Sequence, residues 1–253
     1  MSLIKSPAQI DKIRQSARIL AAALRTLREK AAVGVNLLEL EEVAKQVITD
    51  HGAKPAFLGY QPYGARKPYP YALCTSLGEV VVHGLPTDYI LKSGDVLKMD
   101  LGVDWRGGIS DAAITVPIGD VSKEDRKLIK LTRKALLAGV GQVAPGKTTG
   151  DIGHAIEQTV LAGGGKIIEG LTGHGVGEAV HEEPAIFNFG EPGDGEKLVP
   201  GMVIAIEPMV SLESGRVSQL NDDSYATIDN STAAHFEHTI LVTKNGHEVL
   251  TQF

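Results

Sequence analysis

Residues 10–27 place apolar side chains every three or four positions, which is the spacing of one face of an amphipathic helix. Ser6 and Pro7 predict the helix start as an N-cap followed by a proline in the first turn, with Gln9 as the capping-box partner. Gly34 predicts its end, and Asn36 predicts the cap of a second helix. The apolar positions of the first helix are Ile10, Ile13, Ala17, Leu20, Leu24 and Leu27.

A similar pair of helices is predicted in the second half of the chain, after Ser122 and after Thr148. Aligning Gly34 with Gly146 also places Asn36 over Thr148. This faint repeat predicts two related halves within a single domain. The domain covers residues 1–253, and its pseudo-symmetric halves cover about residues 1–120 and 121–253.

After each helix pair, the apolar period changes from 3.6 to 2, which predicts strands. In residues 95–105 the odd positions from Leu97 to Trp105 are apolar, while Asp100 lies on the even face. Residues 203–207 and 236–242 read as further strands, and each contains a glutamate, Glu207 or Glu237. Runs of helices followed by runs of strands indicate an α+β fold.

Composition narrows the classes of function. The chain has 253 residues, 43% of them hydrophobic and 22% charged, and a net charge of −6. An acidic chain is not typical of nucleic-acid binders. The single cysteine, Cys74, excludes a disulfide framework and a cysteine-rich zinc site. The sequence has no apolar run of membrane-spanning length and its N-terminus is polar, so we expect a cytoplasmic protein with no membrane partner.

Four acids lie in or beside the apolar strands, and a buried carboxylate is costly unless it is paired or bound to metal. Any one of them could lie at a strand end in water or form a salt bridge. Four would need four cations, which the neighbouring sequence does not supply, so a shared divalent ion is the simpler explanation. The four acids are Asp100, Asp111, Glu207 and Glu237.

A glycine-rich segment, residues 173–177, surrounds His174, and His181 follows seven positions later. Such glycines allow close backbone approach, so that the imidazole can be aimed at one point. Carboxylates with a single imidazole form a hard ligand set that suits Mn, Fe, Co or Zn in a hydrolytic site.

The order Asp100, Asp111, His174, Glu207, Glu237 resembles the five-ligand pattern of the methionine aminopeptidases, which have the pita-bread fold. The short sequence segments around His83, His174, His181, Glu207 and Glu237 also match the motifs of this family. The 30 residues between Glu207 and Glu237 leave no room for the helical insertion of the type II enzymes, so type I is the closer match. The resemblance implies two helix-pair and antiparallel-strand halves around a central curved sheet.

The resemblance also implies roles. Two divalent ions (Co, Mn, Fe or Zn) would share Asp111 and Glu237, with Asp100 on one ion and His174 and Glu207 on the other. A metal-bridging hydroxide would attack, Glu207 would shuttle the proton, and His181 would stabilise the oxyanion. His83 would contact the substrate near the scissile amide. The substrate would be the N-terminal methionine of a peptide or nascent chain, with the ribosome as a candidate partner.

Some positions depart from the family pattern. Gly78 and Ala233 replace residues that help relatives to hold a monovalent cation, so that site is not predicted here. Val180 replaces an aromatic residue, and residues 61–68 are an apparent insertion. The expected wall of the substrate pocket is Phe57, Tyr60, Tyr69 and Val180, with Tyr63 as the alternative to Tyr69. Plain core packing is the competing explanation of these aromatic residues.

Two other functions remain open from the sequence. A proline-specific aminopeptidase or dipeptidase on the same scaffold would carry the same ligands, usually after an additional N-terminal domain. A non-catalytic binding relative would be expected to lose ligands, whereas all five are present here.

Overall fold

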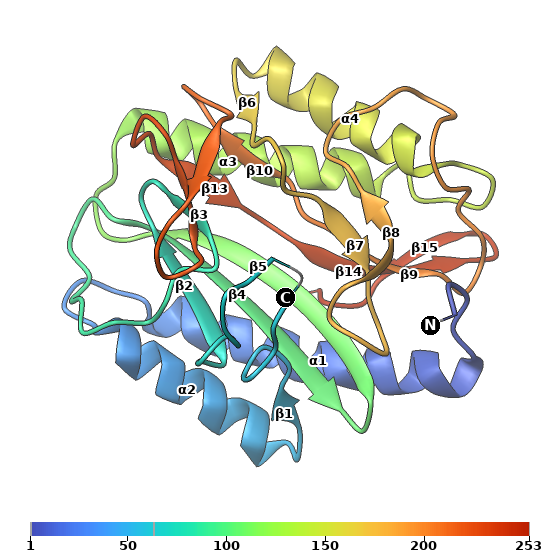
Figure 1. Ribbon diagram of the computed structural model, residues 1–253, viewed down its shortest axis with the longest axis horizontal. Coiled ribbons are helices and arrows are strands. Elements are labelled where there is room, and N and C mark those ends of the chain that lie inside the picture. The colour runs from blue at the N-terminus through green and yellow to red at the C-terminus, as the bar shows by residue number, and fades with distance from the viewer. Residues whose placement is uncertain (1, 63, 253) are drawn as a thin grey trace.

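The computed structural model describes residues 2–62 and 64–252, with helices covering a set of antiparallel strands (Figure 1). One helix pair lies on one side of the strands and the second pair on the other side, which agrees with the α+β prediction. In the described residues, the helices are α1 (Pro7–Lys30), α2 (Leu37–Asp50), α3 (Lys123–Val140) and α4 (Thr149–Ala162). None of them is long and apolar enough to cross a membrane.

The four helices begin where the sequence predicts them to begin. Each N-cap side chain accepts a hydrogen bond from a backbone N–H of the first turn, which satisfies a donor that the helix leaves unpaired. Thr148 and Asp151 form a complete capping box at α4. The caps are Ser6, Asn36, Ser122 and Thr148.

Two local predictions for α1 are wrong. The helix ends at Lys30 rather than at Gly34, because Ala31 takes an extended ψ of 96° and the Gly34 N–H bonds to the carbonyl of Leu91 in another loop. Gln9 does not complete the capping box. Its amide instead donates to two distant carbonyls, since tertiary partners compete with the local one.

The first sheet has the order β1-β4-β2, with β5 on β4. In its register, Asp100 lies opposite Ala113, and Gly102 lies opposite Asp111. Asp100 and Asp111 are therefore diagonal neighbours on one face. The strands are β1 (Lys54–Pro55), β2 (Leu73–Leu77), β4 (Val96–Trp105) and β5 (Gly108–Pro117).

The second large sheet has the order β15-β14-β9-β7-β8 and brings His174 opposite Ala205. Its strands are β7 (Gly173–Gly175), β8 (Glu182–Ile186), β9 (Val203–Ile206), β14 (His238–Thr243) and β15 (Gly246–Val249). The connection from β8 to β9 contains residues 189–195.

Two smaller sheets complete the layer of strands. One has the order β13-β10-β6 and the other β11-β12-β3. Their strands are β3 (Val80–Val82), β6 (Lys166–Ile167), β10 (Met209–Ser211), β11 (Val217–Gln219), β12 (Tyr225–Thr227) and β13 (Ala233–His235).

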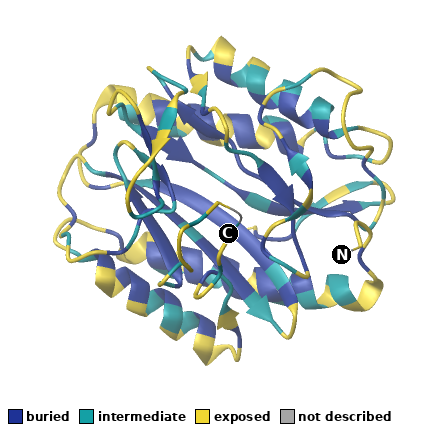
Figure 2. Cartoon of the chain, in the orientation of Figure 1, coloured by how far each residue is buried: buried dark blue, intermediate teal, exposed yellow. Residues whose placement is uncertain are grey.

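Two main hydrophobic cores lie between the helices and the strands. The apolar faces of α1 and α2 pack on the odd positions of β4, such as Leu97, Met99 and Leu101. The faces of α3 and α4 pack on β9 and β14. Figure 2 shows buried strands and exposed outer helix faces. Because successive strand residues alternate, filling the first core with the odd positions of β4 turns Asp100 toward the opposite face.

Candidate metal centre

The five predicted ligands come from both large sheets and meet in one place. The ligand atoms of Asp111, His174 and Glu237 all lie within 4.8 Å of one another, as do those of Glu207, His235 and Glu237. Asp100 neighbours Asp111 through the strand register. The contributing elements are β4 for Asp100, β5 for Asp111, β7 for His174, the end of β9 for Glu207 and the link from β13 to β14 for Glu237.

Buried acceptors in this cluster lack protein donors. Asp111 and Glu237 are only 3% and 2% exposed. Within residues 2–62 and 64–252, Oδ1 of Asp100, Oδ1 of Asp111 and Oε1 of Glu237 are buried without a hydrogen-bond partner. A buried carboxylate left in this state is costly, whereas a bound cation removes the cost. The residues present therefore fit divalent metal ions.

The electrostatics of the cluster point the same way. Burial, with the charge of Glu207 adding to it, raises the pKa of Asp100 to about 7. Burial likewise raises the pKa of Glu207 to about 7. Burial and the charges of Asp100 and Glu207 raise the pKa of Asp111 well above its ordinary value. These carboxylates repel one another, so a shared cation would relieve both desolvation and repulsion.

His235 also lies in this cluster, although it is not among the five predicted ligands. Its Nε2 lies 3.3 Å from Oε2 of Glu207, while Nε2 of His174 lies 3.3 Å from the other oxygen. Thr115 holds the backbone of His235 by donating to its carbonyl and accepting from its N–H. A spacing of two residues from Glu237, which places both side chains on one face of an extended segment, is the sequence signal that could have identified it.

His181 and His83 both line a cavity of about 540 Å³ that opens onto the cluster. The Tyr60 hydroxyl lies 2.9 Å from Nδ1 of His181, and the His181 ring stands edge-on to the ring of His174 at a centroid distance of 4.4 Å. His83 has a positive φ of 61° and its ring packs on Tyr225 at 5.9 Å. Tyr225 was not identified from the sequence.

The residues predicted as the substrate wall also lie around this cavity. Phe57, Cys74 and Val180 form a small buried cluster, and Tyr60 and Tyr69 pack against it. The Tyr69 hydroxyl donates to the carbonyls of Leu73 and Gly84, so its ring is fixed against β2. Tyr63, the alternative to Tyr69, lies outside the described residues.

Sequence reasoning missed the mouth of the cavity, since no motif marks it. Gln219, Asp222 and Asp223 line it from the β11–β12 hairpin. The inserted segment reaches across to them. The Arg66 backbone N–H donates to Oδ2 of Asp223 at 2.9 Å, and its Nε lies 3.6 Å from Oδ1.

A buried lysine lies on the site face of β4. Lys98 is 1% exposed, and its Nζ donates to the Gly78 carbonyl at 2.7 Å. The Ala233 N–H donates to the same carbonyl at 3.0 Å. Burial lowers the pKa of Lys98 to about 7. The Gly78 carbonyl, where the sequence predicted no cation site, thus receives two donors from the chain.

Comparison with known proteins gives one consistent family. The model of metallopeptidase family M24 matches residues 11–244. The methionine aminopeptidase of Clostridium perfringens is 41% identical over 252 residues, which covers 99% of each chain. The crystal structure of the Thermotoga maritima methionine aminopeptidase superposes with a TM-score of 0.94 at 39% identity, with all of both chains covered.

A proline-specific relative is less similar. The prolidase of Pyrococcus horikoshii has a TM-score of 0.79 at 26% identity, and this chain spans 63% of its length. Both structural matches have the arrangement of helix pairs around antiparallel strands, so the pita-bread fold predicted from the sequence is confirmed.

Proposed function

The chain belongs to metallopeptidase family M24 and is a metal-dependent aminopeptidase that removes N-terminal methionine; we propose that it does so at the five-ligand cluster described above. One observation carries the assignment of the site. Carboxylates from both halves of the chain converge in one buried place, and within residues 2–62 and 64–252 an oxygen of Asp100, of Asp111 and of Glu237 has no hydrogen-bond partner there.

Two divalent ions, of Co, Mn, Fe or Zn, are proposed as the complement of the cluster. Asp111 and Glu237 belong to the most buried part of it and would be shared, with Asp100 on one ion and His174 and Glu207 on the other. When bound, such ions polarise the scissile carbonyl and make the attacking water more acidic. Oxygen ligands with one imidazole suit any of these metals.

Glu207 is proposed as the group that moves the proton, from the attacking water to the leaving amine. His174 and His235 each contact one of its oxygens, which restricts the rotation of the carboxylate.

His181 is proposed as the donor to the developing oxyanion. Its Nδ1 faces the Tyr60 hydroxyl, so when that hydroxyl donates, the proton of the neutral ring lies on Nε2 and is available to the substrate. Burial lowers the pKa of His181 to about 4, which keeps the ring neutral. His83, which also lines the cavity, would contact the substrate near the scissile amide.

The substrate is proposed to enter as a free peptide or nascent-chain N-terminus, with its first side chain against Phe57, Tyr60, Tyr69 and Val180. We also propose that the protein works in the cytoplasm and that the ribosome is its partner when the substrate is a nascent chain. The single free cysteine, Cys74, is compatible with a reducing compartment. The two cores support one catalytic domain made of two related halves.

The decisive experiment is hydrolysis of Met-Ala-Ser, Leu-Ala-Ser and Ala-Pro-Ser by metal-stripped protein to which Mn, Co, Fe or Zn is returned. We expect metal-dependent release of methionine, and saturation of the protein at two ions per chain. Cleavage of Ala-Pro-Ser in preference would move the activity to the proline-specific branch. Full activity with one ion per chain would contradict the two-metal proposal.

A further inference from the structure

The segment before α1 contains a lysine that is buried although it lies near the start of the chain. Lys5 is 4% exposed. Its backbone N–H donates to the Gly201 carbonyl at 2.8 Å, and the adjacent Ile4 forms an isolated bridge with Met202. The segment is thereby fixed beside the start of β9, with the Lys5 side chain turned inward.

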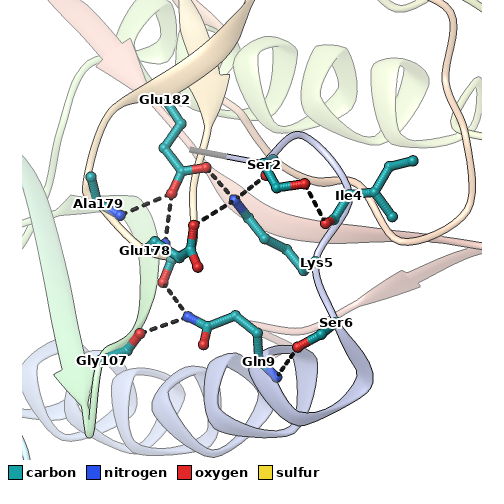
Figure 3. Close-up of polar contacts among 10 residues, drawn as sticks. Ser2, Ile4, Lys5, Ser6, Gln9, Gly107, Glu178, Ala179 and Glu182 are labelled. Carbon is teal, nitrogen blue, oxygen red and sulfur yellow. Dashed lines mark hydrogen bonds and ion pairs between the residues drawn. The ribbon is translucent and has the colours of Figure 1, made fainter.

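The Lys5 ammonium ends on the carboxylate of Glu182 (Figure 3). It also donates to the Ser2 carbonyl at 2.7 Å, and Glu178 lies 3.9 Å away. The side chain of Glu182 is itself buried. Two buried opposite charges in contact depend on one another, because either charge alone would be left desolvated.

Glu182 uses its second oxygen to hold the loop that precedes β8. Oε1 accepts from the backbone N–H groups of Glu178 at 2.6 Å and Ala179 at 2.9 Å. The loop is thus closed on itself, with the carboxylate at one end and the two N–H groups at the other. Val180 and His181 are the residues between these two fixed points.

A second contact, from the first turn of α1, fixes the start of this loop. The Gln9 side chain donates to the Gly177 carbonyl at 3.2 Å and to the Gly107 carbonyl in the β4–β5 turn at 2.6 Å. The Lys5 side chain also lies close to the backbone of Gly177, since a Cβ added to Gly177 would lie 3.0 Å from Cε of Lys5. Residues 2–9 therefore hold the loop at both ends.

We propose that the buried Lys5–Glu182 pair is a positioning pair for His181, so that the segment before α1 sets the place of the oxyanion donor and of the Val180 wall. This inference rests on the proposed role of His181. Lys5 itself does not line the cavity; it acts through Glu182 and the closed loop. A group that must sit within hydrogen-bond distance of a developing charge loses most of its effect when it is displaced by about 1 Å.

The test is a double-mutant cycle between Lys5→Met and His181→Ala, with kcat and KM measured on Met-Ala-Ser in protein loaded with Mn²⁺. We expect Lys5→Met to lower kcat about tenfold with little change in KM. In the His181→Ala background the same substitution should change kcat by less than about twofold, because the displaced donor is already absent. Lys5→Arg should recover part of the loss, and Glu182→Gln should resemble Lys5→Met.

Arg14→Met is the matched control, since it breaks an exposed ion pair between α1 and Glu248 on β15 and should leave kcat unchanged. Metal content and Tm are measured for every variant, and kcat is measured at a temperature well below the lowest Tm. Equal losses from Lys5→Met in both backgrounds, or a lower Tm with normal kcat, would overturn the inference. Should Lys5→Met not fold, Glu182→Gln and Lys5→Arg carry the same cycle. A normal kcat for His181→Ala alone would instead refute the proposed role of His181.

Discussion

The hydroxyl of Tyr60 lies 2.9 Å from Nδ1 of His181, which joins the segment before the insertion to the loop before β8. The two rings are 5.3 Å apart and tilted, so the contact is made at the edge of the imidazole. The tyrosine that the sequence suggested only as a wall of the substrate pocket thus also sets the orientation of the candidate oxyanion donor.

Tyr60→Phe should therefore lower kcat about tenfold while KM for a methionine peptide changes little. The ring would still fill the wall, but His181 would lose the partner that selects its tautomer, and part of the stabilisation of the transition state would be lost. Steady-state kinetics on Met-Ala-Ser measure this. Tyr89→Phe, which removes a hydroxyl bonded to Asp95 outside the cavity, is the control. A raised KM at normal kcat would reassign Tyr60 to substrate binding alone.

Glu207→Ala should lower kcat by about 10²–10⁴-fold, which is the usual contribution of a general base, and should also weaken metal retention. Metal content after dialysis and kcat at saturating metal separate the two effects. Glu191→Ala, in the exposed loop between β8 and β9, should leave both unchanged. Activity like that of the wild type would show that the proposed proton shuttle is not at this position.

His235→Ala should weaken divalent-metal affinity about 10–100-fold, the usual cost of removing a group that orients a ligand. The reason is the 3.3 Å contact between Nε2 of His235 and Glu207, which would be free to rotate in the variant. Calorimetric titration of the stripped protein with Mn²⁺ or Co²⁺ gives the affinity. His247→Ala, which removes an imidazole that contacts the Val143 carbonyl in a distant turn, is the control and should titrate normally.

Phe57→Ala should widen the pocket and shift selectivity toward larger first residues. Phe57 is buried against Cys74 and Val180, so its removal lowers kcat/KM for methionine about tenfold through lost contact. It should also cost about 3–5 kcal/mol in the free energy of unfolding. A panel of Met, Leu and Phe tripeptides measures the ratio, with the exposed Phe187→Ala as control. An unchanged ratio would favour plain core packing for Phe57.

Acid should destabilise the protein partly through His238, which lies outside the metal cluster. Burial, with the charge of Arg133 adding to it, lowers the pKa of His238 from 6.5 to about 4. Its contribution to stability is complete above the unfolded pKa and is lost as the pH falls from 6.5 to 4, because the unfolded chain binds the proton first. The loss amounts to about 3 kcal/mol at most.

His238→Asn should remove that dependence, since an amide can still meet the Thr251 hydroxyl that Nδ1 contacts at 3.0 Å. Urea unfolding of stripped protein at pH 7 and pH 4 measures the difference between variant and wild type. Between pH 7 and pH 4, the wild type should lose about 2–3 kcal/mol more of its free energy of unfolding than the variant loses. Parallel pH curves for the two proteins would show that His238 does not titrate in this range.

Local patterns by themselves determined the helices and the long strands of this protein. The N-caps at Ser6, Asn36, Ser122 and Thr148 were identifiable because a cap and its partner lie within three residues of one another. The alternation in β4 likewise separates Asp100 from the core because side-chain direction follows from the backbone alone. The four acids and one histidine of the candidate centre were identified from their residue types, their order along the chain and the short sequence segments around them.

Only the tertiary structure decided which distant groups meet. It brings the side chain of His235 into contact with Glu207, that of Tyr60 with His181, and that of Lys5 with Glu182. The two residues of these pairs are 28, 121 and 177 positions apart in the sequence. It also turns the Gln9 side chain away from its cap, because its Nε2 donates to the carbonyls of Gly107 and Gly177 in distant loops. No local pattern encodes such contacts, because they depend on how two sheets pack and on side chains that reach across loops. The sequence determined which chemistry this chain carries, and the packing of the two halves decided which side chains hold that chemistry in place.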